Sequence, residues 1–420
     1  GYSRLAQYAD KLNTGLIELG YLEKKNPHFT RPKLEYLGLY ADEVLLDERY
    51  KYSVLDSKNI KSNRSLNRFD CISAPCMDAC PTEQDIPDYL YYTSKGKLNE
   101  ALEVIYQKNP MPRTLGLVCE HSCQAKCTRI HYDQTLRIRD IKEFVAKKGE
   151  YSPVKPKDKN GIKVAIIGAG PSGLSAAWFL QLEGCEVEIF EKTNRVGGIP
   201  KSIIPDFRLD EDALNADIVR ILELGVKINF HQDINALDIK KLEASFDYIY
   251  LVTGASKNRE LNIPGIENEV VQDPFEFLEM HKLKKMERVF SKVLIIGGGN
   301  TAMDVARMAK KVQNGQGRVV LVYRRTLKQM PAEKQEILDA ISEGVEIREL
   351  LSPTEIITHD GKVFLKLQAM KLAHEIGSDG RKKVEAVEND FIRMEADCII
   401  PALGQLSVPI IQKFNDMARP

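Results

Sequence analysis

Two glycine-rich turns carry the clearest chemistry in this sequence. Gly168-Ala169-Gly170-Pro171-Ser172-Gly173 follows the apolar run KVAII and precedes a segment with helical spacing. In such a turn the first glycine allows the tight bend, the second lets the backbone approach a pyrophosphate, and the third lets the helix pack on the strand. The phosphates then lie at a helix N-terminus, where free N–H groups favour negative charge. The turn therefore predicts a dinucleotide site.

The end of the next predicted strand indicates which dinucleotide binds there. Glu191, followed by Lys192, lies eighteen residues after Gly173, at the end of the strand CEVEIFEK. A carboxylate at this place accepts hydrogen bonds from ribose hydroxyls and repels a 2′-phosphate. We therefore expect FAD or NAD at this site and not NADP. The alternative is a turn that keeps its glycines for packing only.

The second turn has the opposite charge at its strand end. Gly297-Gly298-Gly299-Asn300-Thr301-Ala302 is the G-x-G-x-x-A form, and the next strand ends in Tyr323-Arg324-Arg325. Arginine forks bind phosphate bidentately, so Arg324 and Arg325 predict NADPH, with a solvated strand end as the alternative. A chain with both sites is most simply a flavin enzyme that receives electrons from NADPH.

Six of the eight cysteines form a third constellation, and they are Cys71, Cys76, Cys80, Cys119, Cys123 and Cys127. Most are four residues apart, which places successive thiols on one face of a helix. Thiolates suit iron–sulfur clusters or zinc, but the C-x2-C pairs typical of zinc are absent. Proline directly after Cys80 is also found in ferredoxin-type loops. We expect iron–sulfur clusters, with zinc and metal-free structural thiols as alternatives.

The elements around these residues change in character along the chain. Residues 61–150 contain amphipathic helical segments and no clear strand, and the polar stretch 152–161 is typical of a linker. Two strand–glycine–helix–strand units follow, about 130 residues apart, so we expect two nucleotide-binding domains. A chain of 420 residues has room for two to four domains.

Charge and hydropathy give no reason to expect nucleic acid or a membrane as a partner. Lys+Arg and Asp+Glu number 60 each, which gives no electrostatic reason to expect nucleic acid or an anionic membrane. No apolar run reaches the roughly 18 residues of a membrane span, and the first residues lack the apolar core of a signal peptide. We expect a cytoplasmic protein without membrane insertion. The chain begins without Met, so we also expect it to be cut from something longer.

The order of these motifs resembles the glutamate synthase small-chain family of FAD/NADPH oxidoreductases. That family includes the N-terminal part of dihydropyrimidine dehydrogenase and a selenate-reductase-like branch of iron–sulfur flavoprotein subunits, which is the most similar one. The resemblance runs from about residue 60 to about residue 405. It is carried by the strings FDCISAPCMDACPTEQDIP, VCEHSCQAKCTR, GAGPSGL, FEKTNRVGG, IPDFRL, GGGNTAMDVAR, YRRTLKQMPA and PALGQ.

The resemblance implies an α/β flavoprotein with two Rossmann-like dinucleotide-binding domains, the NADPH domain inserted in the FAD domain, behind an all-α iron–sulfur domain. The expected parts are residues 1–60 as the remnant of an upstream domain, 61–151 as the iron–sulfur domain, 161–288 as the first part of the FAD domain, 289–395 as the NADPH domain, and 396–420 as a truncated return to the FAD domain. The Gly-Asp motif that closes the family's FAD domain is missing before Pro420.

The resemblance also implies further cofactor-binding residues. Those for the flavin are Gly197, Gly198, Arg208, Thr253 and Gly254. The alternatives are glycines that the turns require for a positive φ and, for Arg208, a surface residue. Those for NADPH are Gly299, Asn300, Thr301 and Arg324, with Gly404 near the nicotinamide.

For the cysteines, the resemblance implies two [4Fe–4S] clusters. Cys71, Cys76 and Cys127 would hold one, and Cys80, Cys119 and Cys123 the other. The sequence departs from the family at both remaining ligands, where Arg68 and Lys142 stand, the latter beside Glu143. A protonated cationic side chain cannot ligate iron. Three-cysteine clusters, an unexpected ligand and no clusters at all therefore stay open.

The expected function follows from the cofactors. NADPH gives hydride to FAD, and the electrons pass through the clusters to a partner domain or subunit, with no catalytic acid, base or nucleophile. The alternative is an electron-relay or assembly subunit that keeps the fold but lacks NADPH oxidation. A thioredoxin-reductase-like disulfide reductase needs a C-x-x-C beside the flavin. Cys398 is the sole cysteine after Gly297, so the sequence does not support this rival function.

Overall fold

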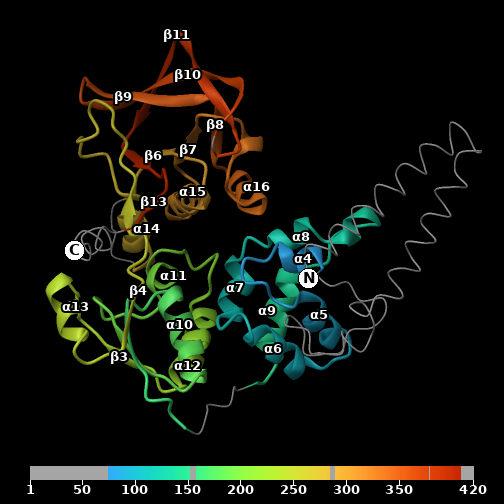
Figure 1. Cartoon of the computed structure of the whole chain (residues 1–420). Coiled ribbons are helices and arrows are strands. Elements are labelled where there is room, and N and C mark those ends of the chain that lie inside the picture. The colour runs from blue at the N-terminus through green and yellow to red at the C-terminus, as the bar shows by residue number, and fades with distance from the viewer. Residues whose placement is uncertain (1–73, 152–157, 284–288, 378, 408–420) are drawn as a thin grey trace, which may run out of the picture.

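The structure is a computed structural model that describes residues 74–151, 158–283, 289–377 and 379–407. The described part of the cysteine region is helical and lies beside the two sheet-containing units (Figure 1). Its elements are α4 (Pro75–Asp78), α5 (Ile86–Ser94), α6 (Leu98–Tyr106), α7 (Pro112–Val118), α8 (Ser122–Ala125), η3 (Thr128–His131) and α9 (Ile138–Lys148). Across the described ranges, no helix has both the length and the apolar character that crossing a bilayer requires.

A parallel four-stranded sheet forms the first α/β unit, with strand order β3-β2-β1-β4. Residues 164–167 of β1 are all buried, which is typical of a parallel strand covered on both faces. The elements are β1 (Lys163–Ile167), α10 (Pro171–Leu182), β2 (Glu186–Phe190), α11 (Gly198–Ser202), α12 (Glu211–Leu222), β3 (Lys227–Asn229), α13 (Ala236–Leu242) and β4 (Tyr248–Leu251). A connection with β5 (Lys257–Asn258) and α14 (Pro274–Lys282) leads to the second unit.

The second unit pairs a parallel sheet with an antiparallel one. Its parallel sheet has the order β12-β6-β7-β8, and the antiparallel sheet β11-β10-β9 covers one of its faces. The other face packs on α14 and α15. The elements are β6 (Lys292–Ile296), α15 (Asn300–Val312), β7 (Arg318–Tyr323), η4 (Leu327–Gln329), α16 (Lys334–Ser342), β8 (Glu346–Glu349), β9 (Leu351–His359), β10 (Lys362–Ile376), β11 (Lys382–Ala396) and β12 (Cys398–Pro401).

The return of the chain corrects one expected boundary. Strand β12 follows residue 396, yet it pairs in parallel with β6 of the second sheet, from Cys398–Val293 to Pro401–Ile296. The return towards the first unit therefore takes place after Pro401, where β13 (Gln405–Leu406) pairs with β5. A short apolar strand such as CIIP carries no local signal for the sheet that it joins.

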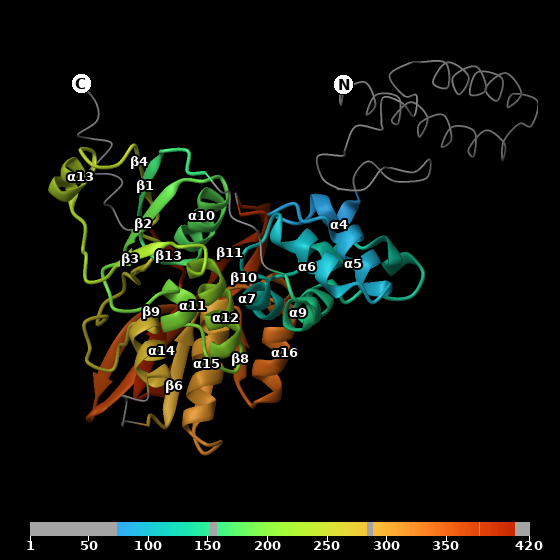
Figure 2. The ribbon, with the colours of Figure 1, turned by 90° about the horizontal axis from the view of Figure 1, so that it is seen from below.

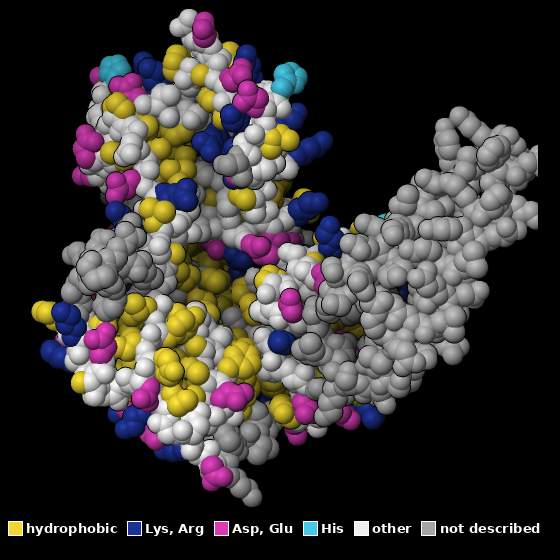
Figure 3. All heavy atoms as spheres, in the orientation of Figure 1, with side chains coloured by type: hydrophobic (Ala, Val, Ile, Leu, Met, Phe, Trp, Pro, Cys, Tyr) yellow, Lys and Arg dark blue, Asp and Glu magenta, His cyan; other side chains and the backbone are white. Residues whose placement is uncertain are grey.

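One continuous core joins the helical region to the first unit. The ring of Tyr106 on α6 stacks on Trp178 of α10, with the ring centroids 5.1 Å apart. Figure 2 shows the helical region alongside both units. Acidic and basic side chains lie side by side where the second unit meets the other two (Figure 3). The helical region is thus packed against the sheets and is not tethered by its linker alone.

Candidate functional site

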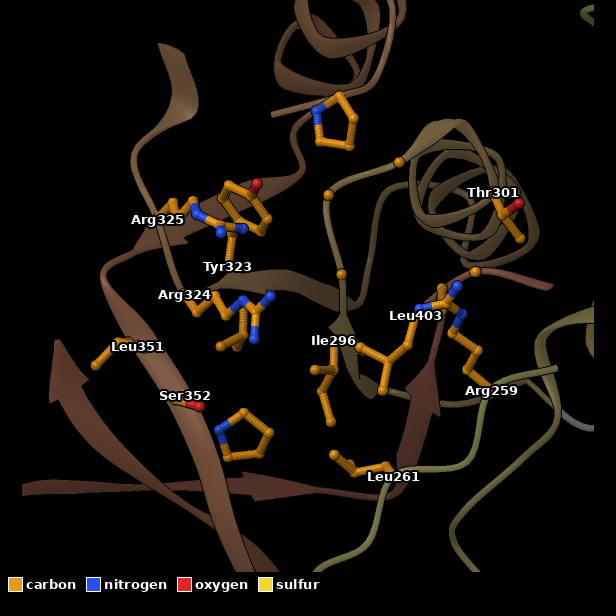
Figure 4. Close-up of a pocket in the computed structure, with 18 of the residues that line it drawn as sticks. Arg259, Leu261, Ile296, Thr301, Tyr323, Arg324, Arg325, Leu351, Ser352 and Leu403 are labelled. Atoms are coloured by element: carbon orange, nitrogen blue, oxygen red, sulfur yellow. The ribbon is translucent and has the colours of Figure 1, made fainter. Parts of the chain in front are cut away.

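A pocket of about 580 Å³ lies at the carboxyl ends of the second sheet's strands. The turn between β6 and α15, the end of β7, and residues 259–261, 351–353 and 402–405 line it. Arg324 and Arg259 extend towards it from opposite sides (Figure 4). Ligands of open α/β sheets bind in crevices at this edge of the strands.

The glycines of this turn are required by the backbone geometry. Gly297 has φ +148°, and a Cβ built there lies 2.2 Å from the Ala402 carbonyl oxygen. A Cβ on Gly298 lies 2.6 Å from the Tyr323 ring. By contrast, a Cβ on Gly299 meets nothing within 4 Å, so open space lies above the start of α15. That space is where a pyrophosphate binds in such turns.

Asn300 and Thr301 begin α15, and both side chains have protein partners. The Asn300 Oδ1 accepts from the Glu333 backbone N–H at 2.9 Å, and its Nδ2 lies 3.3 Å from Glu120 Oε1. The Thr301 hydroxyl lies 3.3 Å from Gln405 Nε2. These contacts fix the turn, and the expected role of both residues towards NADPH stays a prediction.

The two predicted arginines lie in different environments. Arg324 is exposed and, within the described part of the chain, makes no hydrogen bond or ion pair. Arg325 is only 5% exposed; its Nε donates to the Lys382 carbonyl at 2.7 Å, and its Nη2 lies 3.2 Å from Asp379 Oδ2. Arg324 is therefore free to bind a ligand, whereas Arg325 already holds the hairpin between β10 and β11.

The first glycine turn has the same construction. Gly168 has φ +116°, and its Cβ would lie 2.5 Å from the Val252 carbonyl oxygen. A Cβ on Gly173 would lie 2.1 Å from the Gly168 carbonyl oxygen, so helix α10 packs directly on the turn. Gly170 again has nothing within 4 Å. Pro171 is the first residue of α10, and the Ser172 hydroxyl lies 3.4 Å from the Tyr250 hydroxyl.

Glu191 closes over this turn from the end of β2. Its Oε2 accepts from the Ala169 backbone N–H at 2.9 Å. Its Oε1 accepts from the backbone N–H and the hydroxyl of Thr193, each at 2.9 Å. The carboxylate is 9% exposed and has lone pairs left for a ribose hydroxyl. The next residue, Lys192, is exposed.

The other expected flavin residues lie around the same strand ends. A Cβ on Gly198 would lie 2.9 Å from the Gly170 Cα, and the Gly197 N–H donates to the Ala169 carbonyl at 2.9 Å. Thr253 and Gly254 follow β4, next to β1. The open cradle at Gly170 and these surrounding residues fit the phosphate portion of FAD.

Arg208 lies at the junction of the two units. Its Nη1 donates to both carboxylate oxygens of Asp304 on α15 at 2.8 Å, and its Nε lies 3.1 Å from Glu336 on α16. The side chain is 10% exposed. Its expected role towards the flavin stays a prediction, because this guanidinium is already paired with two carboxylates of the second unit.

Gly404 follows β12 and lines the pocket of the second unit. Its φ is +104°, and its carbonyl accepts from the Arg259 N–H at 2.9 Å. The turn at Gly404 therefore brings Arg259 to the pocket.

Five of the six expected cluster cysteines are described, and Cys71, like Arg68, lies outside the described residues. Burial, followed by the neighbouring Cys119 and Cys80, raises the pKa of Cys123 to about 11. Burial likewise raises the pKa of Cys76, with a further contribution from Cys127. Cys119, Cys80 and Cys76 therefore lie near Cys123, and Cys127 lies near Cys76.

The donors are chemically suited to the expected clusters, because thiolates are the usual ligands of iron–sulfur clusters. Within the described ranges, no three His, Cys, Asp or Glu side chains converge closely enough to hold one metal ion. A cluster of several irons needs thiolates around a wider space.

Lys142 lies near the thiols of Cys80 and Cys123. It is 4% exposed on α9. Burial acts to raise the pKa of Cys80, but hydrogen bonds around Thr82 and Gln84 and the charge of Lys142 outweigh it, so this pKa is lowered. A cation therefore stands near Cys80 and Cys123, where the resemblance implies a ligand.

Several residues of the site have no signal in the local sequence. Arg381 and Arg259 line the pocket, but they lie outside the glycine turn and the β7 strand end. From the cysteine region, Glu120 contacts the pocket turn at Asn300, and His121 contacts Glu333 at the start of α16.

Comparison with known families divides the chain where the structure does. Residues 162–409 match the family described as pyridine nucleotide-disulphide oxidoreductase. Residues 47–152 match the family described as dihydropyrimidine dehydrogenase domain II, 4Fe-4S cluster.

Individual relatives are longer than this chain. YgfK of Escherichia coli (strain K12) is 35% identical over 379 residues, which cover 89% of this chain and 36% of that protein. The NADPH-Fe(3+) oxidoreductase subunit beta of Geobacter sulfurreducens is 31% identical, with 82% and 53% covered. The glutamate synthase [NADPH] small chain of Azospirillum brasilense is 28% identical, with 82% and 75% covered. The chain spans about a third of YgfK and about half of the Geobacter subunit.

Among solved structures, FprA of Mycobacterium tuberculosis in complex with NADPH has a similar fold. The TM-score is 0.51 at 18% identity, and the match covers 59% of this chain and 72% of that one. At this identity the likeness shows a shared fold.

Proposed function

The chain belongs to the pyridine nucleotide-disulphide oxidoreductase family and carries a 4Fe-4S-type domain in front of it, and on this premise we propose that it takes hydride from NADPH onto FAD. The electrons then pass through iron–sulfur clusters to a partner domain or subunit. The names of two relatives, an NADPH-Fe(3+) oxidoreductase subunit and an NADPH-dependent glutamate synthase small chain, support this proposal.

One observation carries the proposal: two glycine turns of the same construction end in opposite charges. Glu191 presents a carboxylate beside the turn of the first unit. Arg324 presents an unpaired guanidinium to the pocket of the second. The first arrangement disfavours a 2′-phosphate, and the second attracts one. FAD in the first unit and NADPH in the second is the assignment that satisfies both.

The residues of each unit then have distinct tasks. The turn 168–173 and residues 197–198 and 253–254 hold the phosphates and ribityl chain of FAD, and Glu191 holds its ribose. The turn 297–301 holds the NADPH pyrophosphate, and Arg324 its 2′-phosphate, with Gly404 near the nicotinamide. When bound, FAD supplies an acceptor for hydride and a donor of single electrons, so no side chain has to move a proton.

The helical region supplies the exit for the electrons. Cys76, Cys127 and Cys71 form one cluster site in this proposal, and Cys80, Cys119 and Cys123 form the other. The acceptor lies on a downstream domain or partner subunit, as the greater length of YgfK and the subunit name of the Geobacter relative support. A cytoplasmic location agrees with the free thiols of all seven described cysteines.

An anaerobic reduction experiment tests the proposal. The chain is loaded with FAD, iron and sulfide, and its absorbance is followed after addition of NADPH or NADH. We expect the flavin bands to bleach faster with NADPH, by a factor on the order of ten or more, as one charge-assisted phosphate contact gives. A chain that holds FAD but is reduced by neither nucleotide contradicts the proposal and favours the relay role.

A further inference from the structure

We propose that Arg381, on the hairpin between β10 and β11, is the second arginine that binds the 2′-phosphate of NADPH, next to Arg324. Arg325 takes the part of a positioning residue, which holds Arg381 in place through Asp379. This inference rests on the proposed function and refines it. It assigns part of the nucleotide specificity to Arg381, which lies 57 positions after Arg324 in the sequence.

Arg325 lines the pocket but is only 5% exposed, so its guanidinium offers a ligand much less surface than that of Arg381, whose side chain is 31% exposed. The Arg325 guanidinium donates to the Lys382 carbonyl at 2.7 Å and contacts Asp379 at 3.2 Å. Both partners belong to the hairpin. Turning Arg325 into the pocket would break both contacts, which is unfavourable.

Arg381 reaches the pocket from that hairpin. It lines the pocket, and its side chain is 31% exposed. Its Nη1 donates to the Tyr323 hydroxyl at 3.3 Å, which places the guanidinium at the end of β7, directly before Arg324. Its Nε and Nη2 contact Asp379 Oδ2 at 3.1 and 2.9 Å. A guanidinium has five N–H donors, so two remain for a phosphate.

The hairpin turn is itself well held. The Gly377 N–H donates to the Arg381 carbonyl at 2.8 Å, and the Arg381 N–H donates to Asp379 Oδ1 at 3.1 Å. Asp379 therefore binds the backbone and the side chain of Arg381 as well as Arg325. This arrangement fixes the direction of the Arg381 side chain.

The charges at the strand end match a phosphate. Asp379 carries one negative charge against the positive charges of Arg325 and Arg381, and Arg324 adds a further positive charge without a carboxylate partner in the described chain. These four side chains together carry an excess of two positive charges, and a phosphate monoester carries nearly two negative ones at neutral pH. A nucleotide without the 2′-phosphate gains nothing from either Arg324 or Arg381.

A nucleotide titration tests the inference without flavin turnover. The FAD-loaded chain is titrated with 2′,5′-ADP and with 5′-AMP by calorimetry. For Arg381→Met we expect the Kd for 2′,5′-ADP to rise about tenfold or more, while the Kd for 5′-AMP stays within a factor of two. Arg393→Met, at an exposed position on β11 outside the pocket, is the matched control and should change neither Kd.

A double variant tests the positioning role of Arg325. Arg325→Gln alone should also weaken 2′,5′-ADP binding, but it should add less than a factor of two in the Arg381→Met background, because both act through one contact. Unchanged 5′-AMP binding shows that the pocket is still folded. Additive losses instead assign the phosphate directly to Arg325 and overturn the positioning role.

The outcomes separate this inference from the proposed function. If the unmodified chain binds 2′,5′-ADP no better than 5′-AMP, both the NADPH assignment and the inference are wrong. If it prefers 2′,5′-ADP and Arg381→Met keeps that preference, the inference on Arg381 is wrong and the NADPH assignment stands.

Discussion

The Nε2 of His121 lies 3.3 Å from Oε1 of Glu333, so the loop between Cys119 and Cys123 touches the start of α16. A second contact, from Asn300 Nδ2 to Glu120 Oε1, joins the same loop to the pocket turn. Asn300 and Glu333 are in turn joined by a hydrogen bond of 2.9 Å. The cluster region and the nucleotide pocket thus share one polar network, and a change in one can be transmitted to the other.

Breaking this network should loosen the cysteine loop. His121→Ala with Glu120→Ala removes both contacts, each worth roughly 0.5 to 1 kcal/mol because the groups are partly exposed. We expect faster hydrogen exchange of the amides of residues 119–123, and slower reduction of the clusters by NADPH at an unchanged rate of flavin reduction.

A surface ion pair of the same region serves as the control. Arg129 and Asp133 are both about half exposed, so Arg129→Ala should leave these exchange rates as they are. Equal amide exchange rates in the unmodified chain, the double variant and Arg129→Ala would show that the network does not hold the loop.

The Arg208–Asp304 pair predicts a large stability effect at the junction of the units. Arg208→Met leaves Asp304, which is 8% exposed, without its ion-pair partner, whereas Glu336 keeps its ion pair with Arg307. An unpaired buried charge costs about 3 to 5 kcal/mol. We expect a loss of this order in urea unfolding, and partial recovery in Arg208→Met with Asp304→Asn.

FAD affinity distinguishes this role from the one expected from the resemblance. If Arg208 acts at the junction, the variant that also carries Asp304→Asn regains both stability and FAD binding. A chain that regains stability but still binds FAD weakly assigns Arg208 to the flavin. Arg318→Ala, which breaks an exposed pair with Glu346, should cost less than about 1 kcal/mol.

The buried carboxyl of Asp217 on α12 should make the packing of the helical region against the first α/β unit depend on pH. It accepts from the backbone N–H groups of Thr114 at 2.7 Å and Arg113 at 3.3 Å at the start of α7. Burial raises its pKa from 3.8 to about 6. The pKa of Asp217 is therefore higher in the folded chain than in the unfolded chain. The stabilisation from this carboxyl is full below pH 3.8 and is lost as the pH rises through 6.

Urea unfolding at two pH values measures this effect. When the pH rises from 5 to 8, the ionisation of Asp217 should lower the free energy of unfolding by on the order of 1 kcal/mol. Asp217→Asn should remove this difference between the two pH values. Asp158→Asn, at an exposed position, should keep it. The same pH dependence in all three chains would assign it to other groups.

The fold was largely predictable because its signals are local. Both glycine turns lie between a strand and a helix as expected, and the fold class of two α/β units behind a helical iron–sulfur domain is confirmed by the family matches. The sheet that takes up β12 was not predictable, since CIIP has the same apolar character as a strand of either unit.

The site residues that could not be predicted from the sequence depend on contacts between segments that are distant in the chain. Arg381 reaches Tyr323 only because β10 and β11 form a long hairpin that folds back over β7. His121 meets Glu333 only because the helical region packs beside the second unit. Neither contact has a spacing rule in the sequence, whereas Glu191 could be located by its fixed distance from the turn.

Glu191 predicts a loss of FAD affinity that can be separated from a loss of stability. Both of its oxygens already hold the backbone, so Glu191→Gln replaces one acceptor by a donor facing either Ala169 or Thr193. If Glu191 also binds the FAD ribose, the Kd for FAD should rise about tenfold, as one lost charge-assisted hydrogen bond implies.

The control lies on the same strand. Glu188→Gln affects a side chain that contacts Lys227 and Asn229 away from the turn, and it should leave the Kd for FAD unchanged. Flavin fluorescence quenching gives both Kd values, and urea unfolding of the FAD-free chains gives their stability. A Glu191→Gln chain that is less stable but binds FAD as tightly as before would show that the carboxylate only supports the turn. FAD specificity would then come from the shape of the cradle at Gly170, where open space lies above the backbone.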